Sequence, residues 1–224
     1  MYIKSFLPSK AMQKFSDVYA LILLESVLEN YVPWSSSAMC PGAVVKILNE
    51  IIINGRRTVV EFGSGVSTLY VAKVMKEYGG KICSVDHDEL WIEKLSQIAS
   101  KEGVLANIEF VVAPMAKSEL ALDGNEWYDE LRLFQLIKNY KFDMVIVDGP
   151  LAYKKDIMRS RFPALPFLHE NSLLLSDHTV FMDDALRAGE AEIIRRYCGT
   201  YGYSFDVYKE HRVAIAHTKD CYTI

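Results

Sequence analysis

A short turn containing two glycines is the part of this sequence whose residue types are best suited to hold a ligand. Gly63 and Gly65 follow the apolar run 58–62 and lead into a helix-like segment. Glycine lets a ligand approach the backbone closely, and the free N–H groups at a helix start face whatever lies in front of them. A dinucleotide-binding turn would have a third glycine at the position of Thr68, and a P-loop would end in Gly-Lys-Ser/Thr. Both features are missing here, and Glu61, just before the turn, would repel a phosphate and attract a cation.

A second acidic residue, Asp86, ends the next strand-like run. A carboxylate at that place can accept two hydrogen bonds from a ribose diol, as it does in nucleotide-binding sheets. The alternative is that Asp86 and Asp88 cap the helix-like segment that follows. Together with the turn, the first interpretation predicts a nucleoside ligand that carries no pyrophosphate and has an amine or another cation near Glu61.

Three further acids follow two later strand-like runs: Asp148 ends the fourth run, and Asp183 and Asp184 end the fifth. Because parallel strands end at the same edge of a sheet, the three carboxylates are expected to meet in one crevice. Unpaired, they would repel one another. A divalent cation would resolve the conflict, and hard oxygen ligands suit Mg²⁺, Mn²⁺ or Ca²⁺ better than zinc. The alternative is a helix cap at 183–184 with Arg187 as an ion-pair partner one turn on.

The elements that must position these residues alternate along the chain from residue 58. The strand-like segments are 58–62, 81–85, 108–112, 144–147, 173–175 with 180–182, 204–208 and 213–216. The helix-like segments are 67–78, 89–101, 126–139, 156–170 and 188–197. Apolar runs such as MVIV are typical of strands covered on both faces. The pattern therefore predicts an α/β fold, a three-layer sandwich with a seven-stranded, mostly parallel sheet.

The residues before the first strand have a helical pattern. Apolar residues recur at helical spacing between 15 and 27, and the pattern resumes at 43–53 after a break. We expect residues 1–54 to form a helical extension packed on the core and residues 55–224 to form one structural unit. The alternative, which gives these helices a specific role, is that they form a lid over the site or the contact face of a homodimer.

Composition and charge exclude several classes of protein. The 224 residues include 25 Lys and Arg against 29 Asp and Glu, a net charge of −4, so no basic surface for nucleic acid or an anionic membrane is expected. No apolar run approaches a membrane span or a signal peptide. The four cysteines are far apart and form no CxxC pair, which favours reduced thiols and a cytoplasmic location.

In this order and spacing, the motifs resemble those of the class I S-adenosylmethionine-dependent methyltransferases, over residues 35–217. EFGSGVST matches the family's first motif, with Ser67 where many members have a third glycine, and Asp86 matches the second acid. FDMVIVDGP, with Asp148, matches the fourth motif. VVAPM, SRFPALP and DDALRAGE are similar to a bacterial branch of the family. The resemblance implies the Rossmann-like methyltransferase fold with extra N-terminal helices, and S-adenosylmethionine as the cofactor.

The resemblance also implies a role for each matching position. The methionine part of the cofactor would lie along the glycines and the backbone up to Ser67, and Asp86 would bind the ribose hydroxyls. Glu61 would hold the ammonium group directly or through water, and Pro114 and Met115 would border the adenine with His87 beside it. The full set expected at the cofactor is Glu61, Gly63, Ser64, Gly65, Ser67, Thr68, Asp86, His87, Pro114, Met115 and Asp148.

The acid cluster resembles the magnesium site of catechol O-methyltransferase and its relatives. This similarity implies Asp148, Asp183 and Asp184 as ligands of Mg²⁺, although Asp184 stands where those enzymes usually have Asn. They also have a lysine close after the first acid, whereas Gly149-Pro150 follows here. The identity of the base is therefore open.

The expected reaction is methyl transfer to an oxygen of a small hydroxylated molecule, with nitrogen as the next choice. Asp148 and Asp183 are the expected catalytic residues, as bases or through a bound Mg²⁺. Arg159 and Arg161 are the expected substrate contacts, with a surface role as the alternative, and Trp127 and Tyr128 are expected in the core or the crevice wall. The competing functions are a non-catalytic protein that binds S-adenosylmethionine or a nucleoside, and an NAD-dependent oxidoreductase, which the missing third glycine disfavours.

Overall fold

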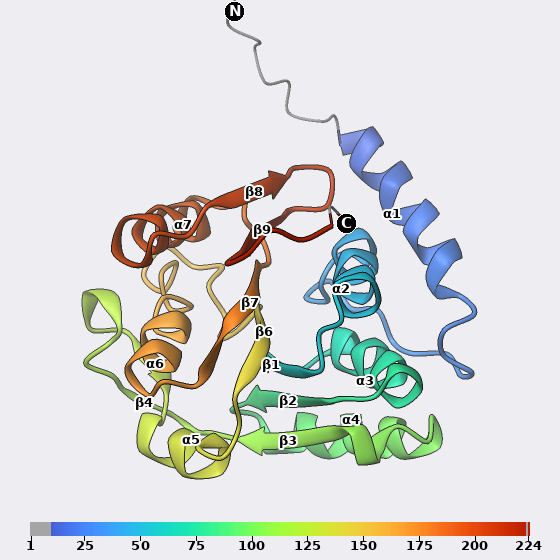
Figure 1. Cartoon of the computed structure of the whole chain (residues 1–224), viewed down its shortest axis with the longest axis horizontal. Helices are drawn as coiled ribbons and strands as arrows, with labels where there is room; N and C mark the ends of the chain where they lie inside the picture. The colour runs from blue at the N-terminus through green and yellow to red at the C-terminus, as the bar shows by residue number, and fades with distance from the viewer. Residues whose placement is uncertain (1–9, 223) are drawn as a thin grey trace, which may run out of the picture.

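The computed structural model describes residues 10–222 and residue 224, and its centre is a seven-stranded sheet (Figure 1). The strands of this sheet are β1 (Thr58–Phe62), β2 (Lys81–Asp86), β3 (Ile108–Val112), β6 (Phe142–Val147), β7 (Leu174–Met182), β8 (Phe205–Tyr208) and β9 (Val213–His217). Their order is β3-β2-β1-β6-β7-β9-β8, and β9 alone runs antiparallel to its neighbours. The predicted α/β fold with a seven-stranded, mostly parallel sheet is confirmed.

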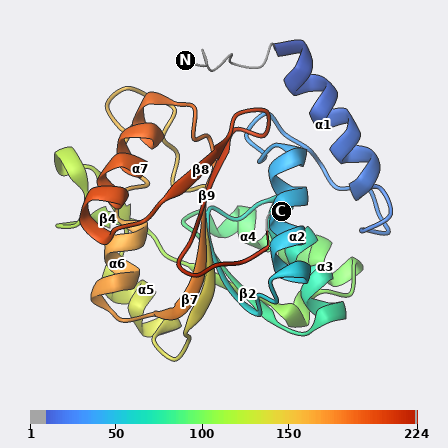
Figure 2. The same ribbon diagram turned by 45° about the horizontal axis from the view of Figure 1, so that its top comes forward.

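Helices cover both faces of the sheet, so the molecule has three layers (Figure 2). One face carries α2 (Pro41–Ile53), α3 (Val66–Tyr78) and α4 (Glu89–Lys101), and the other carries α5 (Glu130–Ile137), α6 (Ala164–Glu170) and α7 (Ala188–Tyr201). Successive side chains of a strand point to opposite faces. Val59 therefore packs with the α2 and α3 side chains, and Val60 packs with the α5, α6 and α7 side chains. This two-sided burial is why the central strands are continuous apolar runs.

Two of the predicted helices differ from the structure. The helix expected over 126–139 is two elements: β5 (Glu126–Tyr128) pairs antiparallel with β4 (Met115–Lys117), and α5 begins after Asp129, whose carboxylate caps it. The helix expected over 156–170 begins only at Ala164, and the residues before it form turns. The β4–β5 pairing is the physical reason for the first error, because it buries the side chains of Trp127 and Tyr128 in a way that local helical spacing does not show.

The N-terminal helices differ in how much of their surface is buried. Helix α2 contributes Ala43, Ile47 and Ile51, each fully buried, to the same core as β1 and α3. Helix α1 (Lys10–Leu24) lies beside α2 on the side away from the sheet (Figure 1) and buries Ala20 and Leu24. In the described part of the chain, no helix combines the length and the apolar character that crossing a membrane requires. The first nine residues of the predicted extension lie outside the described residues.

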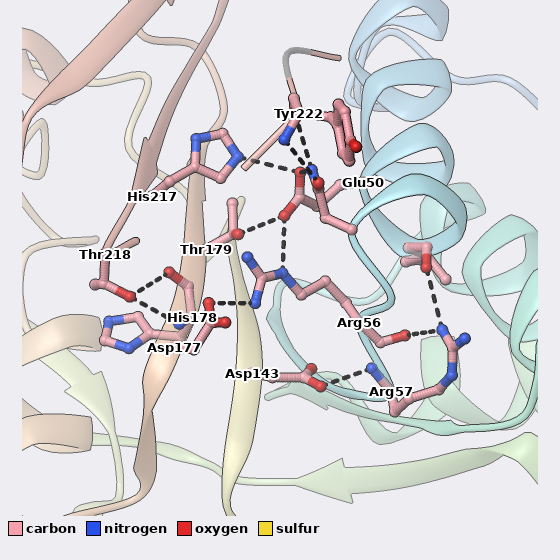
Figure 3. Close-up of polar contacts among 12 residues, drawn as sticks. Glu50, Arg56, Arg57, Asp143, Asp177, His178, Thr179, His217, Thr218 and Tyr222 are labelled. Atoms are coloured by element: carbon pink, nitrogen blue, oxygen red, sulfur yellow. Dashed lines mark hydrogen bonds and ion pairs between the residues drawn. The ribbon is translucent and has the colours of Figure 1, made fainter. Parts of the chain in front are cut away.

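A buried polar network fixes α2 to the sheet at the edge opposite the strand ends that carry the acids (Figure 3). Glu50 is fully buried and accepts hydrogen bonds from Arg56 Nε at 2.8 Å and Thr179 Oγ1 at 2.5 Å. Its other oxygen accepts one from Asn54 at 2.7 Å and lies 3.1 Å from His217 Nε2. These four contacts outweigh burial and lower the pKa of Glu50 to about 2. The network therefore holds a negative charge inside the fold, joined to α2, β7 and β9.

Candidate active site

A cavity of about 420 Å³ lies at the carboxyl ends of β1, β2 and β6. Strand β1 pairs with β2 on one side and with β6 on the other. The chain runs from β1 outward to β3 and then continues at β6 on the opposite side of β1, so the strand order reverses here. In open α/β sheets this switch point is where ligands bind. The wall includes Ser64, Gly65, Ser67, Asp86, His87, Trp91, Tyr128 and Asp148, together with residues of the 33–39 segment before α2. The volume is within the range of small-molecule sites.

The glycine turn is shaped by its own hydrogen bonds. Gly63 has a positive φ of 97°, and a Cβ there would lie 2.8 Å from the backbone nitrogen of Gly149. Gly63 N donates to Val85 O at 2.8 Å, Ser64 N to Asp86 Oδ2 at 3.0 Å, and Gly65 N to Thr68 Oγ1 at 2.9 Å. These three amides, which were expected to face the ligand, are therefore engaged within the protein. The turn is a preformed surface along which a ligand can lie.

Gly63→Ala is expected to lower the free energy of unfolding by about 2 kcal/mol, because the methyl group meets backbone atoms and the positive φ is strained for alanine. The matched control is Gly55→Ala, since Gly55 also has a positive φ of 73° but open space around its Cβ position. Urea unfolding measures both variants. If both variants lose the same free energy of unfolding, the close contact between Gly63 and the residues after β6 does not add to the cost of the substitution.

Glu61 lies beneath the turn rather than in the cavity wall. Its side chain is fully buried, and its two oxygens accept hydrogen bonds from the hydroxyls of Ser67 at 2.6 Å, Ser84 at 2.8 Å and Thr68. Burial raises the pKa of Glu61 to about 7, against the effect of these hydrogen bonds. Glu61 therefore holds the start of α3 against β2. The expected contact with an ammonium group does not follow from this position, because three protein hydroxyls already occupy the carboxylate. Thr68 is buried as well.

Asp86 lines the cavity and is oriented by backbone amides. Its Oδ1 accepts hydrogen bonds from His87 N at 2.7 Å and Asp88 N at 3.0 Å, and its Oδ2 accepts the one from Ser64 N. A carboxylate has about four lone-pair sites, so acceptor capacity remains for a hydroxyl group. Asp88 caps α4 by accepting from Trp91 N at 3.0 Å. Of the two acids in the alternative interpretation, only Asp88 is the helix cap.

Two aromatic residues in the wall were not predicted as ligand contacts. Trp91 Nε1 donates to Ser64 O at 2.8 Å, so the indole fixes the turn and faces the cavity with it. Tyr128 is almost fully buried, and its hydroxyl has no hydrogen-bond partner among the residues that the structure describes. A buried hydroxyl without a partner costs free energy, so a ligand atom is its natural partner. The sequence predicted a core or wall position for Tyr128 but gave no sign of the free hydroxyl.

Pro114 and Met115, expected beside the adenine, do not line the cavity. Pro114 is exposed, and its carbonyl accepts a hydrogen bond from Asp129 N at 2.8 Å. Met115 begins β4 and pairs with Tyr128 in β5. The unpredicted β4–β5 hairpin is the reason, because it sets the direction of the chain after β3. His87, by contrast, does line the cavity.

The three later acids come together as predicted. One carboxylate oxygen from each of Asp148, Asp183 and Asp184 lies within 4.8 Å of the others. Asp148 lines the cavity already described, whereas Asp183 and Asp184 line a second cavity of about 430 Å³. Ser37 and Ala38 line both cavities, so the two adjoin.

The carboxyl groups of Asp148 and Asp183 lie close together, with one oxygen of each within 4.8 Å of the other. Burial and the charge of Asp183 hold the pKa of Asp148 well above its ordinary value. Burial and the charge of Asp184 raise the pKa of Asp183 to about 6. The two carboxyl groups can therefore share one proton at the junction of the two cavities.

The two arginines that were expected to bind substrate have other partners. Arg161 is buried, with 4% of its surface exposed, and its guanidinium lies among the acids. Its Nη2 donates to Asp148 Oδ1 at 3.1 Å and its Nη1 to Asp184 Oδ2 at 3.3 Å. Arg159 forms ion pairs with Glu192 at 3.1 Å and with Asp123 at 2.5 Å. Neither guanidinium lines either cavity, because both are taken up by carboxylates of the protein.

The cluster fits a divalent metal ion poorly. Its carboxylate oxygens are the ligand type that Mg²⁺ prefers. Arg161, however, already donates to Asp148 and Asp184, and Arg187 Nη1 lies 2.7 Å from Asp184 Oδ2. The pairing of Asp184 with Arg187 is the one expected in the alternative interpretation without metal. A metal ion would have to share its ligand atoms with guanidinium groups.

Comparison with known proteins identifies the family. A protein-family model described as a methyltransferase domain matches residues 60–179, more than half of the chain. The chain belongs to this methyltransferase family. The matched segment contains the glycine turn, Asp86, Asp148 and Arg161. No curated protein sequence matches the chain.

Several solved methyltransferase structures have the same fold as this chain. A methyltransferase from Podospora anserina, solved with S-adenosylhomocysteine, is 12% identical with a TM-score of 0.64, and the match covers 97% of this chain and 100% of that one. The O-methyltransferase TomG from Streptomyces achromogenes, solved with S-adenosylmethionine, is 15% identical with a TM-score of 0.57, over 92% and 97% of the two chains. An O-methyltransferase from Bacillus cereus is 14% identical with a TM-score of 0.53, over 95% and 93%. At these identities the likeness shows the fold, and the prediction of a Rossmann-like methyltransferase fold is confirmed.

Proposed function

We propose that this methyltransferase transfers a methyl group from S-adenosylmethionine to an oxygen of a small hydroxylated molecule. The observation that carries the proposal is the close pair of carboxyl groups, Asp148 and Asp183. Asp148 lines the first cavity, which the glycine turn and Asp86 also line. Asp183 lines the adjoining second cavity. A proton acceptor therefore stands where the two cavities meet. The O-methyltransferases among the structural neighbours support the choice of oxygen as the acceptor atom.

The first cavity suits S-adenosylmethionine. Asp86 has acceptor capacity for the ribose hydroxyls, and the turn at Gly63–Gly65 and the side chain of Tyr128 line the same cavity. Among the residues that the structure describes, His87 is the only one with a basic side chain that lines this cavity and could contact a pyrophosphate. Bound there, S-adenosylmethionine supplies a methyl group on a positively charged sulfur, which leaves as a neutral thioether when the methyl group is transferred.

The second cavity is the proposed acceptor site. Asp183 takes the proton of the acceptor hydroxyl as the new oxygen–carbon bond forms, with the carboxyl group of Asp148 close beside it. Ser36, Ser37 and Arg212 also line this cavity and supply hydrogen-bonding groups. Holding the two reactants in line accounts for much of the rate, in the order of 7 to 11 kcal/mol.

Thermal melts and labelled methyl transfer test the proposal together. S-adenosylhomocysteine should raise the melting temperature and NAD should not, since a ligand at 100 times its Kd adds about 2.7 kcal/mol to stability. Label from S-adenosylmethionine should then enter a panel of phenols, hydroxy acids and sugars. A shift with NAD alone would favour the oxidoreductase. Tight binding of S-adenosylhomocysteine without transfer to any extract would favour the non-catalytic binding protein.

Asp86→Asn is expected to weaken the binding of S-adenosylhomocysteine by about 10- to 100-fold, because the amide loses the charge and one acceptor oxygen that serve the ribose. Isothermal titration calorimetry measures the Kd. Asp129→Asn is the matched control, since Asp129 caps α5 through Arg132 N and asparagine caps equally well. An unchanged Kd in Asp86→Asn would place the ribose elsewhere.

We also propose that the protein forms a homodimer through its N-terminal helices. Helix α1 leaves a stripe of Phe15, Val18, Tyr19 and Ile22 exposed, with exposed fractions of 78%, 56%, 61% and 62%. These residues have the i, i+3, i+4, i+7 spacing of one helix face, and a face of this kind can pair with itself about a two-fold axis. Light scattering after size exclusion should give a dimer for the wild type and a monomer for Phe15→Lys/Ile22→Lys. A monomeric wild type at micromolar concentration would contradict it.

The four cysteines support the expected cytoplasmic location. Cys40, Cys83, Cys198 and Cys221 are all free thiols. Burial raises the pKa values of Cys40 and Cys83 to about 12, so these two thiols are unreactive at neutral pH. Free thiols of this kind are typical of proteins in a reducing compartment.

A further inference from the structure

We propose that the guanidinium of Arg161 is the built-in cation of the carboxylate cluster, and that methyl transfer at this site needs no divalent metal ion. The inference rests on the proposed function, because it concerns the same Asp148 and Asp183 pair. It is an alternative to the magnesium-assisted mechanism that the sequence suggested.

The first support is the position of the guanidinium. Arg161 reaches four acidic residues: Asp148 Oδ1 at 3.1 Å, Asp184 Oδ2 at 3.3 Å, Glu190 Oε1 at 3.6 Å, and Asp183 through its backbone oxygen at 3.4 Å. Two of these contacts join the carboxylates that a metal ion would use. Mg²⁺ requires near-octahedral ligands at about 2.0–2.1 Å. Asp148 Oδ1 and Asp184 Oδ2 instead accept hydrogen bonds from the guanidinium nitrogens of Arg161.

The second support is the charge. Asp148, Asp183, Asp184 and Glu190 carry at most four negative charges. Arg161 and Arg187 supply two positive charges in direct contact with this group. The guanidinium group stays protonated at every physiological pH. The two arginines therefore supply two positive charges, as many as a Mg²⁺ ion would bring.

The third support is that Arg161 is fixed in place. Its Nε donates to Pro150 O at 3.2 Å, and the buried Tyr197 hydroxyl donates to the backbone oxygens of Arg161 at 3.3 Å and Phe162 at 2.7 Å. Glu190 is fully buried, and its carboxylate oxygens have no hydrogen-bond partner among the described residues. Arg161 and Arg187 are the cations within ion-pair distance of Glu190 in the described part of the chain. Arg161 is thus a positioning residue, which acts through Asp148 and touches neither cavity.

The wild-type protein provides the first test. Mn²⁺ and Mg²⁺ at millimolar concentration should leave the melting temperature unchanged and give no heat in calorimetry, and EDTA should change the methyl-transfer rate by less than about twofold. A metal-dependent rise in melting temperature, or loss of transfer in EDTA that Mg²⁺ restores, would overturn the proposal. Failure of the proposed function looks different, since S-adenosylhomocysteine would then give no shift and no acceptor would be labelled.

Substitutions of Arg161 provide the second test, with Arg195→Met, at an exposed position of α7, as the control. Arg161→Met removes the cation and should create a Mn²⁺-dependent rise in melting temperature, which adding Asp183→Asn abolishes. Arg161→Lys keeps the charge but loses the planar fork. It should lower kcat by about 10-fold, leave the KM for S-adenosylmethionine within about twofold, and gain no Mn²⁺ response. A folded Arg161→Met that shows no response to Mn²⁺ would contradict the proposal, and the wild-type titration decides it if that variant fails to fold.

Discussion

Asp183→Asn is expected to lower kcat for methyl transfer by about 10²- to 10⁴-fold, the usual contribution of a general base. The asparagine keeps the shape of the side chain but cannot take the proton of the acceptor hydroxyl. The KM for S-adenosylmethionine should change little, since Asp183 lines the acceptor cavity and not the first one. Steady-state kinetics with the labelled cofactor measures both quantities.

The structural integrity of Asp183→Asn is checked by the shift that S-adenosylhomocysteine produces in its melting temperature, which should match the wild type. Asp206→Asn, in the edge strand β8, is a control for the loss of one acidic charge. If Asp183→Asn retains more than about a tenth of the wild-type kcat, the acceptor proton goes elsewhere, and the junction of the two cavities is not the catalytic centre.

Glu50→Ala is expected to lower the free energy of unfolding by about 3–5 kcal/mol, because it leaves the charge of Arg56 buried without its partner. Arg56 is 4% exposed, and its remaining ion pair is with Asp177 at 2.8 Å, a side chain that is about half exposed. Hydrogen bonds from Thr179 and Asn54 are lost as well (Figure 3). Urea unfolding measures the change. Glu77→Ala, at an exposed position of α3, is the control and should change stability by less than about 0.5 kcal/mol.

The lowered pKa of Glu50 also predicts that the stability of the fold decreases at acidic pH. The pKa of Glu50 falls from 4.5 in the unfolded chain to about 2 in the folded one, so its contribution is fully present above pH 4.5 and is lost as the pH falls to about 2. A difference of this size corresponds to about 3 kcal/mol. Stability measured from pH 6 to pH 2 should therefore fall less steeply in Glu50→Gln than in the wild type. Parallel curves would show that the Glu50 carboxylate titrates normally.

The central sheet and its ligand edge were predictable because their signals are local. An apolar run covered on both faces, such as 144–147, is readable from consecutive residues, and so is a glycine turn before a helix. Once the strands are parallel, an acid at the end of each must reach the same edge. The meeting of Asp148, Asp183 and Asp184 follows from those two facts, and the structure confirms it.

The details that the sequence did not predict depend on contacts between distant residues. Glu61 was expected to face a ligand, but Ser84 of β2 and two α3 hydroxyls bind its carboxylate. The segment 126–128 has helical spacing, yet pairing with β4 makes it a strand and places Tyr128 in the wall of the cavity. In each case a tertiary partner outweighs the local preference.

By itself, then, the sequence determined the layered sheet, the turn at Gly63–Gly65, the position of Asp86 and the meeting of the acids. All of these depend on spacing along the chain and on the geometry that every parallel sheet shares. Only the tertiary structure decided what neutralises the acids. The sequence shows that residue 161 is an arginine, but it does not show whether this arginine lies on the surface or is buried beside carboxylates. Its charge is felt within a few ångströms, and which carboxylates lie that close is set by the packing of the 148–163 segment against the start of α7.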